Sequence, residues 1–266
     1  MFLFRAPTAV VVLVISAWIV AATVCGVLFG RRLRTSHEGL REPVGAIQAA
    51  LLAFVAVLFA FGLAMGVDRF EGRREALVVE ANAIGTTYLR AELLPEPQRS
   101  RSLRLLQEYT DARIELSDTD VDSTPFDNAV SKGREIQRSL WSDAGTAVAQ
   151  LPNDTAPRLY LESLNQMIDA DTARVSALGN RIPLSVLTLH IVAGGLAMGV
   201  LGLFMGLLGR GARVALAGAV LVVLILLVII DLDRPRRGFV VVPRGPLTAL
   251  RASMNEVPAA GGPILN

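Results

Sequence analysis

Four long segments without Asp, Glu, Lys or Arg dominate the sequence and restrict the folds open to it. Three of them exceed the ~20 residues that a helix needs to cross a hydrocarbon core, and the fourth is shorter but almost purely aliphatic. The mean hydropathy of +0.49 is also too high for an ordinary soluble domain of 266 residues. The sequence therefore predicts an all-α membrane protein with four transmembrane helices, at residues 8–30, 44–67, 183–209 and 214–230.

The first apolar segment is expected to stay in the protein and not to be cleaved as a signal peptide. It exceeds the roughly 7–15 apolar residues of a signal peptide and runs into Arg31 and Arg32 without a clear small-x-small cleavage site. Cys25 within it is the only cysteine, which excludes an intramolecular disulfide or a thiolate metal cluster. We expect Cys25 to be a small packing residue, and we expect no cofactor.

Two pairs of spans flank a polar middle region, and short links join the members of each pair, so each pair is expected to form an antiparallel hairpin. The N-terminus, the middle region and the tail then share one side of the membrane. The total of nearby arginines places that side in the cytoplasm, although the arginine density of the short links favours the opposite orientation. The predicted parts are a first hairpin (1–67), a helical extramembrane domain (68–182), a second hairpin (183–231) and a polar tail (232–266).

The charge composition argues against nucleic acid as a partner. The net charge is only +2, and acidic and basic residues alternate along the chain without a separate basic patch. Lys132 is the only lysine, and such a preference for arginine is typical of a GC-rich bacterial genome. We therefore expect a multi-pass protein of the bacterial inner membrane, with the lipid bilayer as its first partner.

The middle region is expected to be helical. Nothing between residues 44 and 94 forces a break except Gly62 and Gly66, so the second span is predicted to continue out of the membrane as one helix of about 50 residues. Further helices are predicted at 98–116, 126–150 and from about 155, with a last short one at 246–256. Asp171 interrupts an apolar helical stripe; we expect a solvated carboxylate, with a buried arginine partner as the alternative.

Two faces of the predicted spans stand out by their spacing. One face of the third span carries only glycine, which indicates close helix packing, with a cavity-lining helix as the alternative; its residues are Gly195, Gly199, Gly202 and Gly206. One face of the second span carries large apolar residues, which would form an apolar constriction if helices assembled around an axis, or would otherwise face lipid or core; its residues are Phe54, Leu58, Phe61 and Met65.

Few residues are candidates for chemistry. His190 lies within the third span, where an ionisable group raises the question of function, but a neutral imidazole is easily accommodated and His190 has no ligand companion nearby in the sequence. Neither a zinc-protease motif, nor a phosphate-binding glycine loop after a strand, nor a nucleophile elbow occurs in the sequence. An enzymatic function is therefore not expected.

Two charged stretches, DRFEGRRE at 68–75 and DLDRPRRG at 231–238, follow the second and fourth spans. Both are expected at the membrane surface on the same side, with Glu71 and Arg74 paired along the helix. The carboxylates of Asp231 and Asp233 opposite Arg69 and Arg73 would form ion pairs between the two hairpins. The alternative is a belt of snorkelling charges that sets the orientation.

The same stretches carry a resemblance to a known family. DRFEGRREALVVEANAIGTTYLRAELLPEP, NQMID at 165–169, Arg174, RIP at 181–183 and DLDRPRRGFVVV occur in the expected order. Together they resemble the bestrophin-like domain of bacterial multi-pass membrane proteins, over about residues 40 to 250. The stretch RFEGR at 69–73 is similar, in shortened form, to the motif that follows the second span in bacterial bestrophins.

The resemblance implies a homo-oligomer, pentameric in bestrophins, with a cytoplasmic domain and a central pore lined by the second span. The apolar neck of that pore would correspond to the face of Phe54, Leu58, Phe61 and Met65, and the permeant species would be an anion. Our leading hypothesis is thus an oligomeric ion channel. The second hypothesis is a non-conducting membrane scaffold or sensor whose helical domain binds a partner.

Overall fold

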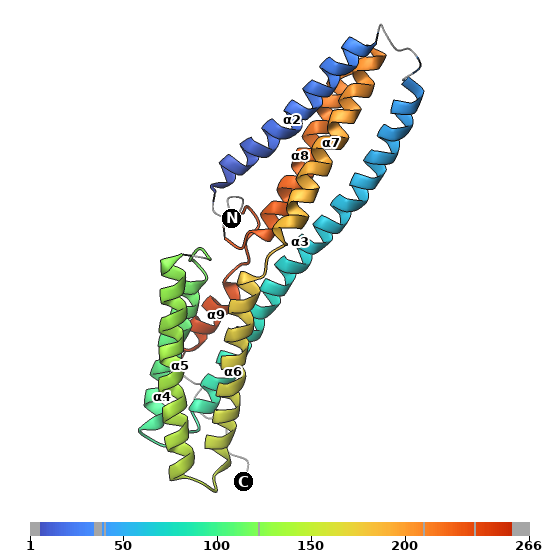
Figure 1. Ribbon diagram of the computed structural model, residues 1–266. Helices are drawn as coiled ribbons and strands as arrows, with labels where there is room; N and C mark the ends of the chain where they lie inside the picture. Colours follow the sequence, from blue (N-terminus) through green and yellow to red (C-terminus); the bar gives the residue numbers. More distant parts are fainter. Residues whose placement is uncertain are drawn as a thin grey trace. The chain divides into compact units, whose positions relative to one another are not determined.

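A computed structural model describes residues 6–34, 39, 41–121, 123–209, 211–236 and 238–256, and within these residues the protein is all-helical (Figure 1). The helices are α2 (Thr8–Leu33), α3 (Arg41–Ala91), α4 (Gln98–Leu116), α5 (Thr124–Gln150), α6 (Thr155–Gly179), α7 (Leu184–Leu208), α8 (Ala212–Asp233) and α9 (Gly245–Ser253). Each predicted helix is confirmed, with ends that differ by a few residues. The long helix is also confirmed, since α3 runs without a break for 51 residues.

Local sequence signals explain where several of these helices begin and end. The Ser123 side chain accepts a hydrogen bond from Phe126 N at the start of α5, and the Asp154 carboxylate accepts one from Ala156 N at the start of α6. Pro97 and Pro183 directly precede α4 and α7. Gly209 ends α7 with a φ of 71°, a left-handed conformation that glycine adopts without strain.

Four helical stretches of the described chain are long and apolar enough to cross a membrane. They are Thr8–Leu33, Arg41–Ala91, Thr155–Leu208, which comprises α6 and α7, and Ala212–Asp233. The chain divides into two compact units, Met1–Phe70 with Arg181–Val241 (the apolar unit) and Glu71–Asn180 with Val242–Asn266 (the bundle unit). The sequence placed the corresponding divisions at 67/68, 182/183 and 231/232.

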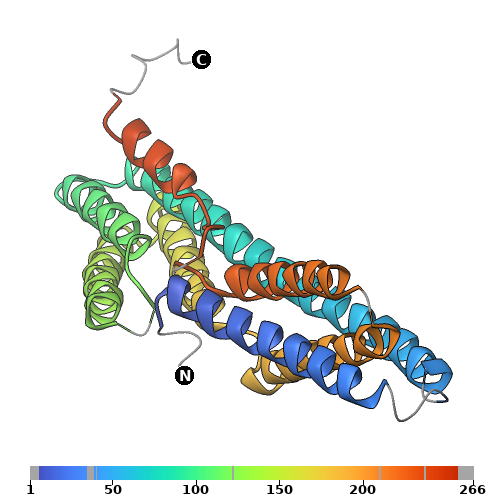
Figure 2. The same ribbon diagram turned by 90° about the horizontal axis from the view of Figure 1, so that it is seen from above.

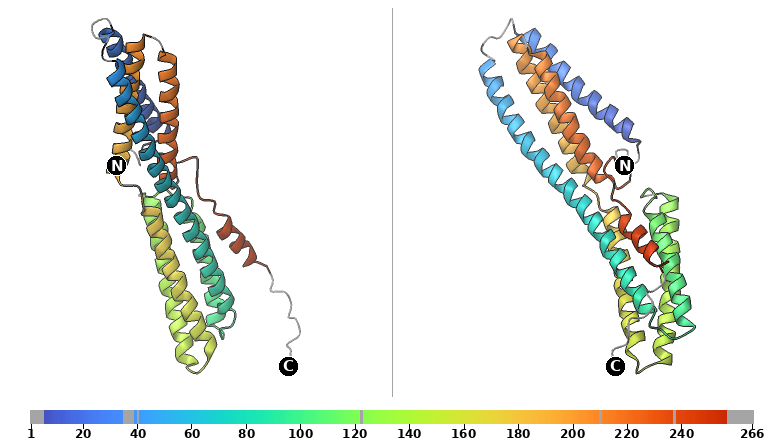
Figure 3. Two further views of the ribbon diagram at one scale, coloured as in Figure 1. Left: turned by 90° about the vertical axis from the view of Figure 1, so that its right-hand side faces the viewer. Right: turned by 180° about the vertical axis from the view of Figure 1, so that it is seen from behind.

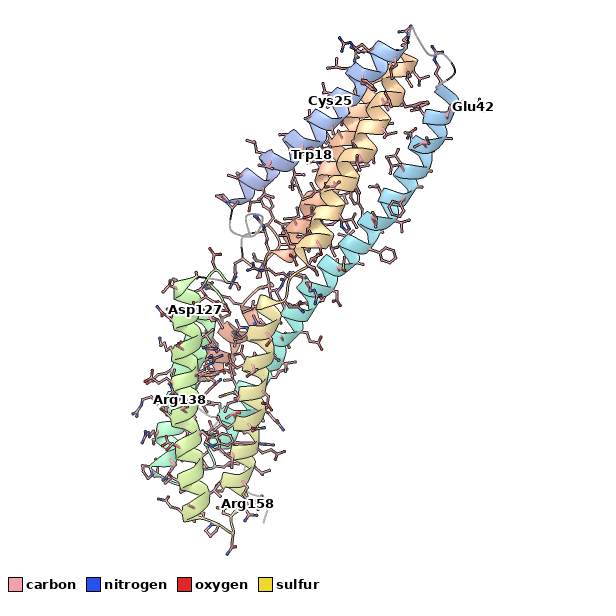
Figure 4. All side chains as sticks on the ribbon, in the orientation of Figure 1. Trp18, Cys25, Glu42, Asp127, Arg138 and Arg158 are labelled. Carbon is pink, nitrogen blue, oxygen red and sulfur yellow. The ribbon has the colours of Figure 1, made fainter. Side chains whose placement is uncertain are left out.

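The apolar unit is built around α7, against which both α2 and α8 pack (Figure 2). Its core consists of apolar side chains, mostly aliphatic, from these helices and from the first part of α3. The C-terminal half of α2 lies close along α7, whereas its N-terminal end diverges from α7 (Figure 3). Trp18 lies between the two helices and donates a hydrogen bond from Nε1 to Ile191 O (3.1 Å; Figure 4). Cys25, expected to pack internally, is instead exposed on α2.

The bundle unit packs α4, α5 and α6 with the last turns of α3 around a second core. Its largest fully buried side chains include Leu106, Tyr109, Leu140, Tyr160 and Met167. The short helix α9 closes one side, where Leu247 is fully buried. The Tyr88 hydroxyl also donates to Met254 O (3.1 Å) just after α9. The tail is therefore part of this core as far as α9.

The expectation of a solvated Asp171 is wrong. Asp171 is buried inside the bundle unit, and its Oδ1 accepts a hydrogen bond from Arg113 Nη1 at 2.5 Å. Gln137 Nε2 donates to Oδ2 at 2.9 Å. A buried carboxylate persists only with such partners, because desolvation of an unpaired charge costs several kcal/mol. The less favoured alternative, a buried arginine partner, is the one that the structure contains.

Candidate functional site

The part of α3 in the apolar unit presents an exposed apolar surface. Phe54 and Phe61 are 60% and 65% exposed, whereas Val55 and Phe59 on the other side of the helix are 3% and 5% exposed. The large apolar residues of the exposed stripe follow helical spacing, and we name it the α3 stripe; they are Ile47, Phe54, Val57 and Phe61. An exposed apolar stripe on a membrane helix faces either lipid or another protein surface.

The four residues proposed from the sequence as pore-lining are divided by the structure between two environments. Phe54 and Phe61 belong to the α3 stripe. Leu58 and Met65 are half-buried and pack against the core of the apolar unit. Of the four residues, only the two phenylalanines are exposed enough to contact lipid or another protein chain. Leu58 and Met65 belong to the packing of α3 against the core.

His190 links α7 to α3. Its Nδ1 lies 2.7 Å from Val186 O in its own helix, and its Nε2 lies 2.8 Å from Leu58 O in α3. The ring fits beside Gly62, where a Cβ atom would lie 2.8 Å from its Cδ2, and it stacks on Phe59 with 5.9 Å between centroids. The sequence reasoning missed this contact between helices, although Gly62 was a signal for a close approach.

The predicted glycine face of α7 lies against α2. A Cβ on Gly202 would meet Thr23 O, and one on Gly206 would lie 2.9 Å from Arg31 N. Gly195 lies beside the Trp18 ring, and Gly199 contacts α2 backbone. Such a surface lets two backbones approach where hydrophobic burial cannot drive association in lipid.

The charges that follow the second and fourth spans have different surroundings. Asp231 is buried, and its carboxylate accepts hydrogen bonds from Phe239 N (2.7 Å) and Val240 N (2.9 Å). Asp233 is fully buried, and its Oδ1 accepts from Ile182 N at 2.8 Å. Both carboxylates thus hold backbone amides of the apolar unit, and their pairing with arginine stays a prediction.

The arginine-rich stretch in α3 is partly buried. Arg73 is buried and Arg69 half-buried, and Glu71 forms the predicted ion pair with Arg74 at 3.4 Å. Both side chains of that pair are more than half exposed, so it contributes little to stability.

A buried polar network that the sequence reasoning missed occupies the bundle unit. Arg113 is fully buried; besides Asp171 it binds Ala129 O (2.6 Å), and its guanidinium lies 5.1 Å from the centre of the Tyr109 ring. A second buried pair joins Arg174 to Glu80. Arg113 follows Leu106 and Tyr109 on the apolar face of α4, and this position was a signal for a buried arginine.

Burial raises the pKa of the Tyr109 hydroxyl well above its usual range, and the neighbouring Glu80 and Asp171 charges add to the effect. The Tyr109 hydroxyl accepts a hydrogen bond from Gln137 Nε2 at 3.0 Å. The network thus keeps a neutral phenol beside two ion pairs. These contacts link three helices, because Tyr109 lies on α4, Gln137 on α5 and Asp171 on α6. No group of three His, Cys, Asp or Glu side chains in the described parts of the chain is placed to hold a metal ion.

These features define an all-helical membrane protein with a helical bundle unit. The family model of the bestrophin-like domain matches residues 14–247, and the chain belongs to this family. No protein of curated function matches the chain.

Solved structures share the fold. A bacterial bestrophin homologue from Klebsiella pneumoniae matches with a TM-score of 0.67 and 13% identity, over 89% of this chain and 97% of the homologue. A point variant of that homologue gives a TM-score of 0.66 and 14% identity over the same shares. At this identity the likeness establishes the fold alone.

Proposed function

We propose that the protein is a homo-oligomeric ion channel of the bacterial inner membrane, pentameric as in bestrophins, which conducts anions through a pore lined by α3. The observation that carries the proposal is the α3 stripe: Phe54 and Phe61 turn away from the core that the other side of α3 fills. Arranged around an axis, such rings make an apolar constriction, which can gate by dewetting. Family membership supports the same function.

The topology of the proposed channel is that of two hairpins. α2 and the first part of α3 form one hairpin, α7 and α8 form the other, and residues 68–182 form a cytoplasmic domain. The lengths and apolar composition of the four candidate spans support four membrane crossings. Reaction of single introduced cysteines with an impermeant thiol reagent, in a Cys25→Ser background, tests it. Labelling of Arg138→Cys from the periplasm would exclude a cytoplasmic domain.

Ion flux tests conduction. The purified protein is reconstituted into liposomes, and the reversal potential is measured under chloride and potassium gradients. Phe54→Ala and Phe61→Ala are expected to change the flux, whereas Leu221→Ala, at a similarly exposed position on α8, is expected to leave it unchanged. Unchanged flux in both phenylalanine variants would refute the neck assignment. A monomer or a compact dimer in native mass spectrometry would refute the channel.

A second function, a non-conducting scaffold or sensor, is favoured by one surface of the bundle unit. A groove of about 450 Å³ is lined by Arg134, Gln137, Arg138, Trp141 and Ile168. Arg138 projects from α5 (Figure 4), and Trp141 is 44% exposed. Arginine and tryptophan are enriched in protein interfaces. A reconstituted oligomer that carries no ion flux would favour this function over the channel.

A further inference from the structure

The His190 side chain lies between two helices of the apolar unit, with both ring nitrogens at hydrogen-bond distance from a backbone carbonyl. Nδ1 is 2.7 Å from Val186 O in α7, and Nε2 is 2.8 Å from Leu58 O in α3. Both distances are at the short end of the range for N–H···O hydrogen bonds. The ring is only 2% exposed, so water does not compete for either nitrogen.

A carbonyl oxygen can only accept a hydrogen bond, and this limits the protonation states that fit the site. A neutral imidazole has one N–H and one lone pair, so it can satisfy one carbonyl and turns a lone pair toward the other. The doubly protonated imidazolium donates from both nitrogens and satisfies both carbonyls. The two contacts of His190 therefore fit the imidazolium form.

Burial of an imidazolium in a membrane helix is costly, and the surroundings of the ring offset part of that cost. Two carbonyl oxygens point at the ring, and Phe59 is stacked on it at 5.9 Å between centroids, where an aromatic face attracts a cation. A neutral ring avoids the buried charge, but it turns a lone pair toward one carbonyl and loses a buried hydrogen bond. Each form thus has a cost that the other lacks, so the proton equilibrium of His190 depends on these two carbonyls.

The membrane-spanning parts of the helices around the ring contain no other ionisable side chain except Cys25, which is exposed. These parts are 8–30 of α2, 43–67 of α3, 184–208 of α7 and 214–230 of α8. Counted along the chain from the residues that surround the ring, the nearest charged residues are Asp68, Arg69, Arg181, Asp231 and Asp233. Both aspartates on α8 already accept hydrogen bonds from backbone amides. The two carbonyls are therefore the polar groups that respond directly to the charge of the ring.

We propose that His190 is a proton-binding site within the membrane, whose imidazolium form ties α7 to α3 and whose neutral form releases the Leu58 carbonyl. The contact with Val186 O lies within one helix, so the contact between helices is the one that lengthens when Nε2 loses its proton to water. Proton binding and the contact of α3 with α7 therefore favour each other, as linkage requires. Leu58 lies one turn from both Phe54 and Phe61, so the released segment is the one that carries the α3 stripe. The site goes beyond ion conduction and does not depend on it.

Solid-state NMR of the full chain in liposomes tests the protonation states. The only other histidine, His37, is replaced (His37→Ala), so that isotope-labelled histidine reports on His190 alone. The spectra are recorded between about pH 5 and 8, the range in which histidine side chains change charge. Both ring nitrogens are expected to be protonated at the acidic end and only Nδ1 at the basic end. A ring that keeps one unprotonated nitrogen at every pH, or two protonated nitrogens at every pH, would overturn the proposal.

Carbonyl labels in two amino-acid types identify the contacts of the ring. The partner of Nε2 is a leucine and the partner of Nδ1 is a valine, so dipolar dephasing by labelled leucine or valine carbonyl carbons separates them. Valine dephasing of Nδ1 is expected at both ends of the pH range, and leucine dephasing of Nε2 is expected to be lost at the basic end. Leucine dephasing that does not change with pH would show a contact without a linked proton and would also overturn the proposal.

Two glycine substitutions on α3 form a matched pair. A Cβ on Gly62 would lie 2.8 Å from Cδ2 of the His190 ring, whereas a Cβ on Gly72 would meet nothing within 4 Å. Gly62→Ala is expected to displace the ring from Leu58 O and to abolish the leucine dephasing of Nε2 at acidic pH, and Gly72→Ala to leave it unchanged. Retained leucine dephasing in Gly62→Ala would overturn the placement of the ring. If Gly62→Ala does not fold, the measurements on the His37→Ala chain decide the question.

Discussion

Two glycines of α5 are expected to respond in opposite directions to the same substitution. Gly133 lies against the buried Arg113, and a Cβ there would stand 2.5 Å from the guanidinium Cζ. Gly145, further along the same helix, has nothing within 4 Å of its Cβ position. The substitution Gly→Ala therefore tests whether the buried arginine occupies the position that the structure gives it.

The magnitudes follow from two opposing contributions. Alanine is favoured over glycine within a helix by about 1 kcal/mol, so Gly145→Ala is expected to stabilise the protein by up to that amount. Gly133→Ala has the same helical gain but displaces Arg113 from Asp171, and disruption of a buried ion pair costs about 3–5 kcal/mol. The net loss is roughly 2–4 kcal/mol. It corresponds to a Tm lower by roughly 5–15 °C.

The assay is thermal unfolding of the detergent-purified chain, combined with hydrogen–deuterium exchange of peptides from α5 and α6. Gly133→Ala is expected to lower the Tm and to speed exchange around Asp171, and Gly145→Ala to do neither. Exchange in α2 and α7 should be the same in both variants. If Gly133→Ala is as stable as Gly145→Ala, Arg113 is not held against α5 and the buried network is wrongly described.

Three further substitutions have defined outcomes. Gly202→Ala places a Cβ against the backbone of α2 and should lower the Tm in detergent. Gly218→Ala makes only ordinary contacts and should leave the Tm unchanged. Equal Tm values for the two variants would refute the close approach of α2 and α7. Burial raises the pKa of the Tyr109 phenol in the folded chain, so above about pH 10 the unfolded chain loses its phenol proton first and the free energy of unfolding falls as the pH rises. Tyr109→Phe removes this group and should make that fall shallower. An unchanged dependence of the free energy of unfolding on pH would contradict this. Asp233→Ala leaves the buried Ile182 N–H without its acceptor and should lower the free energy of unfolding by about 1–3 kcal/mol. Asp233→Asn keeps an acceptor oxygen and should lower it less. Slow hydrogen exchange of the Ile182 amide in the alanine variant would argue against this hydrogen bond.

Helices were predictable from the sequence because their signals are local. Proline at 95 and 97, the cap at Ser123 and the long uncharged segments fix helix ends within a few residues of their own position. The unbroken α3 followed from the absence of any strong helix breaker over its length. Such inferences need no knowledge of what lies beside the helix.

The buried network was not predictable in the same way, since its partners are far apart in the sequence. Arg113 and Asp171 are 58 residues apart, and Arg174 and Glu80 are 94 residues apart. An isolated carboxylate in an apolar stripe is more often solvated, and only the three-dimensional packing of α5 against α4 and α6 decides otherwise. The arginine on the apolar face of α4 was the available signal, and it becomes informative only together with Asp171.

The residues of the predicted constriction were only partly predictable from their spacing. A spacing of three and four residues places Phe54, Leu58, Phe61 and Met65 along one side of a helix, but a helix side is wide enough to include both exposed and half-buried positions. The spacing placed both phenylalanines on one face, but it left open whether that face is exposed or packed in the core. Which neighbours turn toward the core depends on the direction from which α7 and α8 approach α3.

The hydrogen bonds of Asp231 have a consequence for biogenesis. The carboxylate at the end of α8 is buried and is held by amides of residues 239 and 240, which are synthesised later. Until residues 239 and 240 have been synthesised and have folded back onto the end of α8, the Asp231 carboxylate has neither of these amide partners, so its burial is a late step of folding. A chain that stops before residue 239 is therefore expected to keep Asp231 hydrated and to be less stable than the full chain.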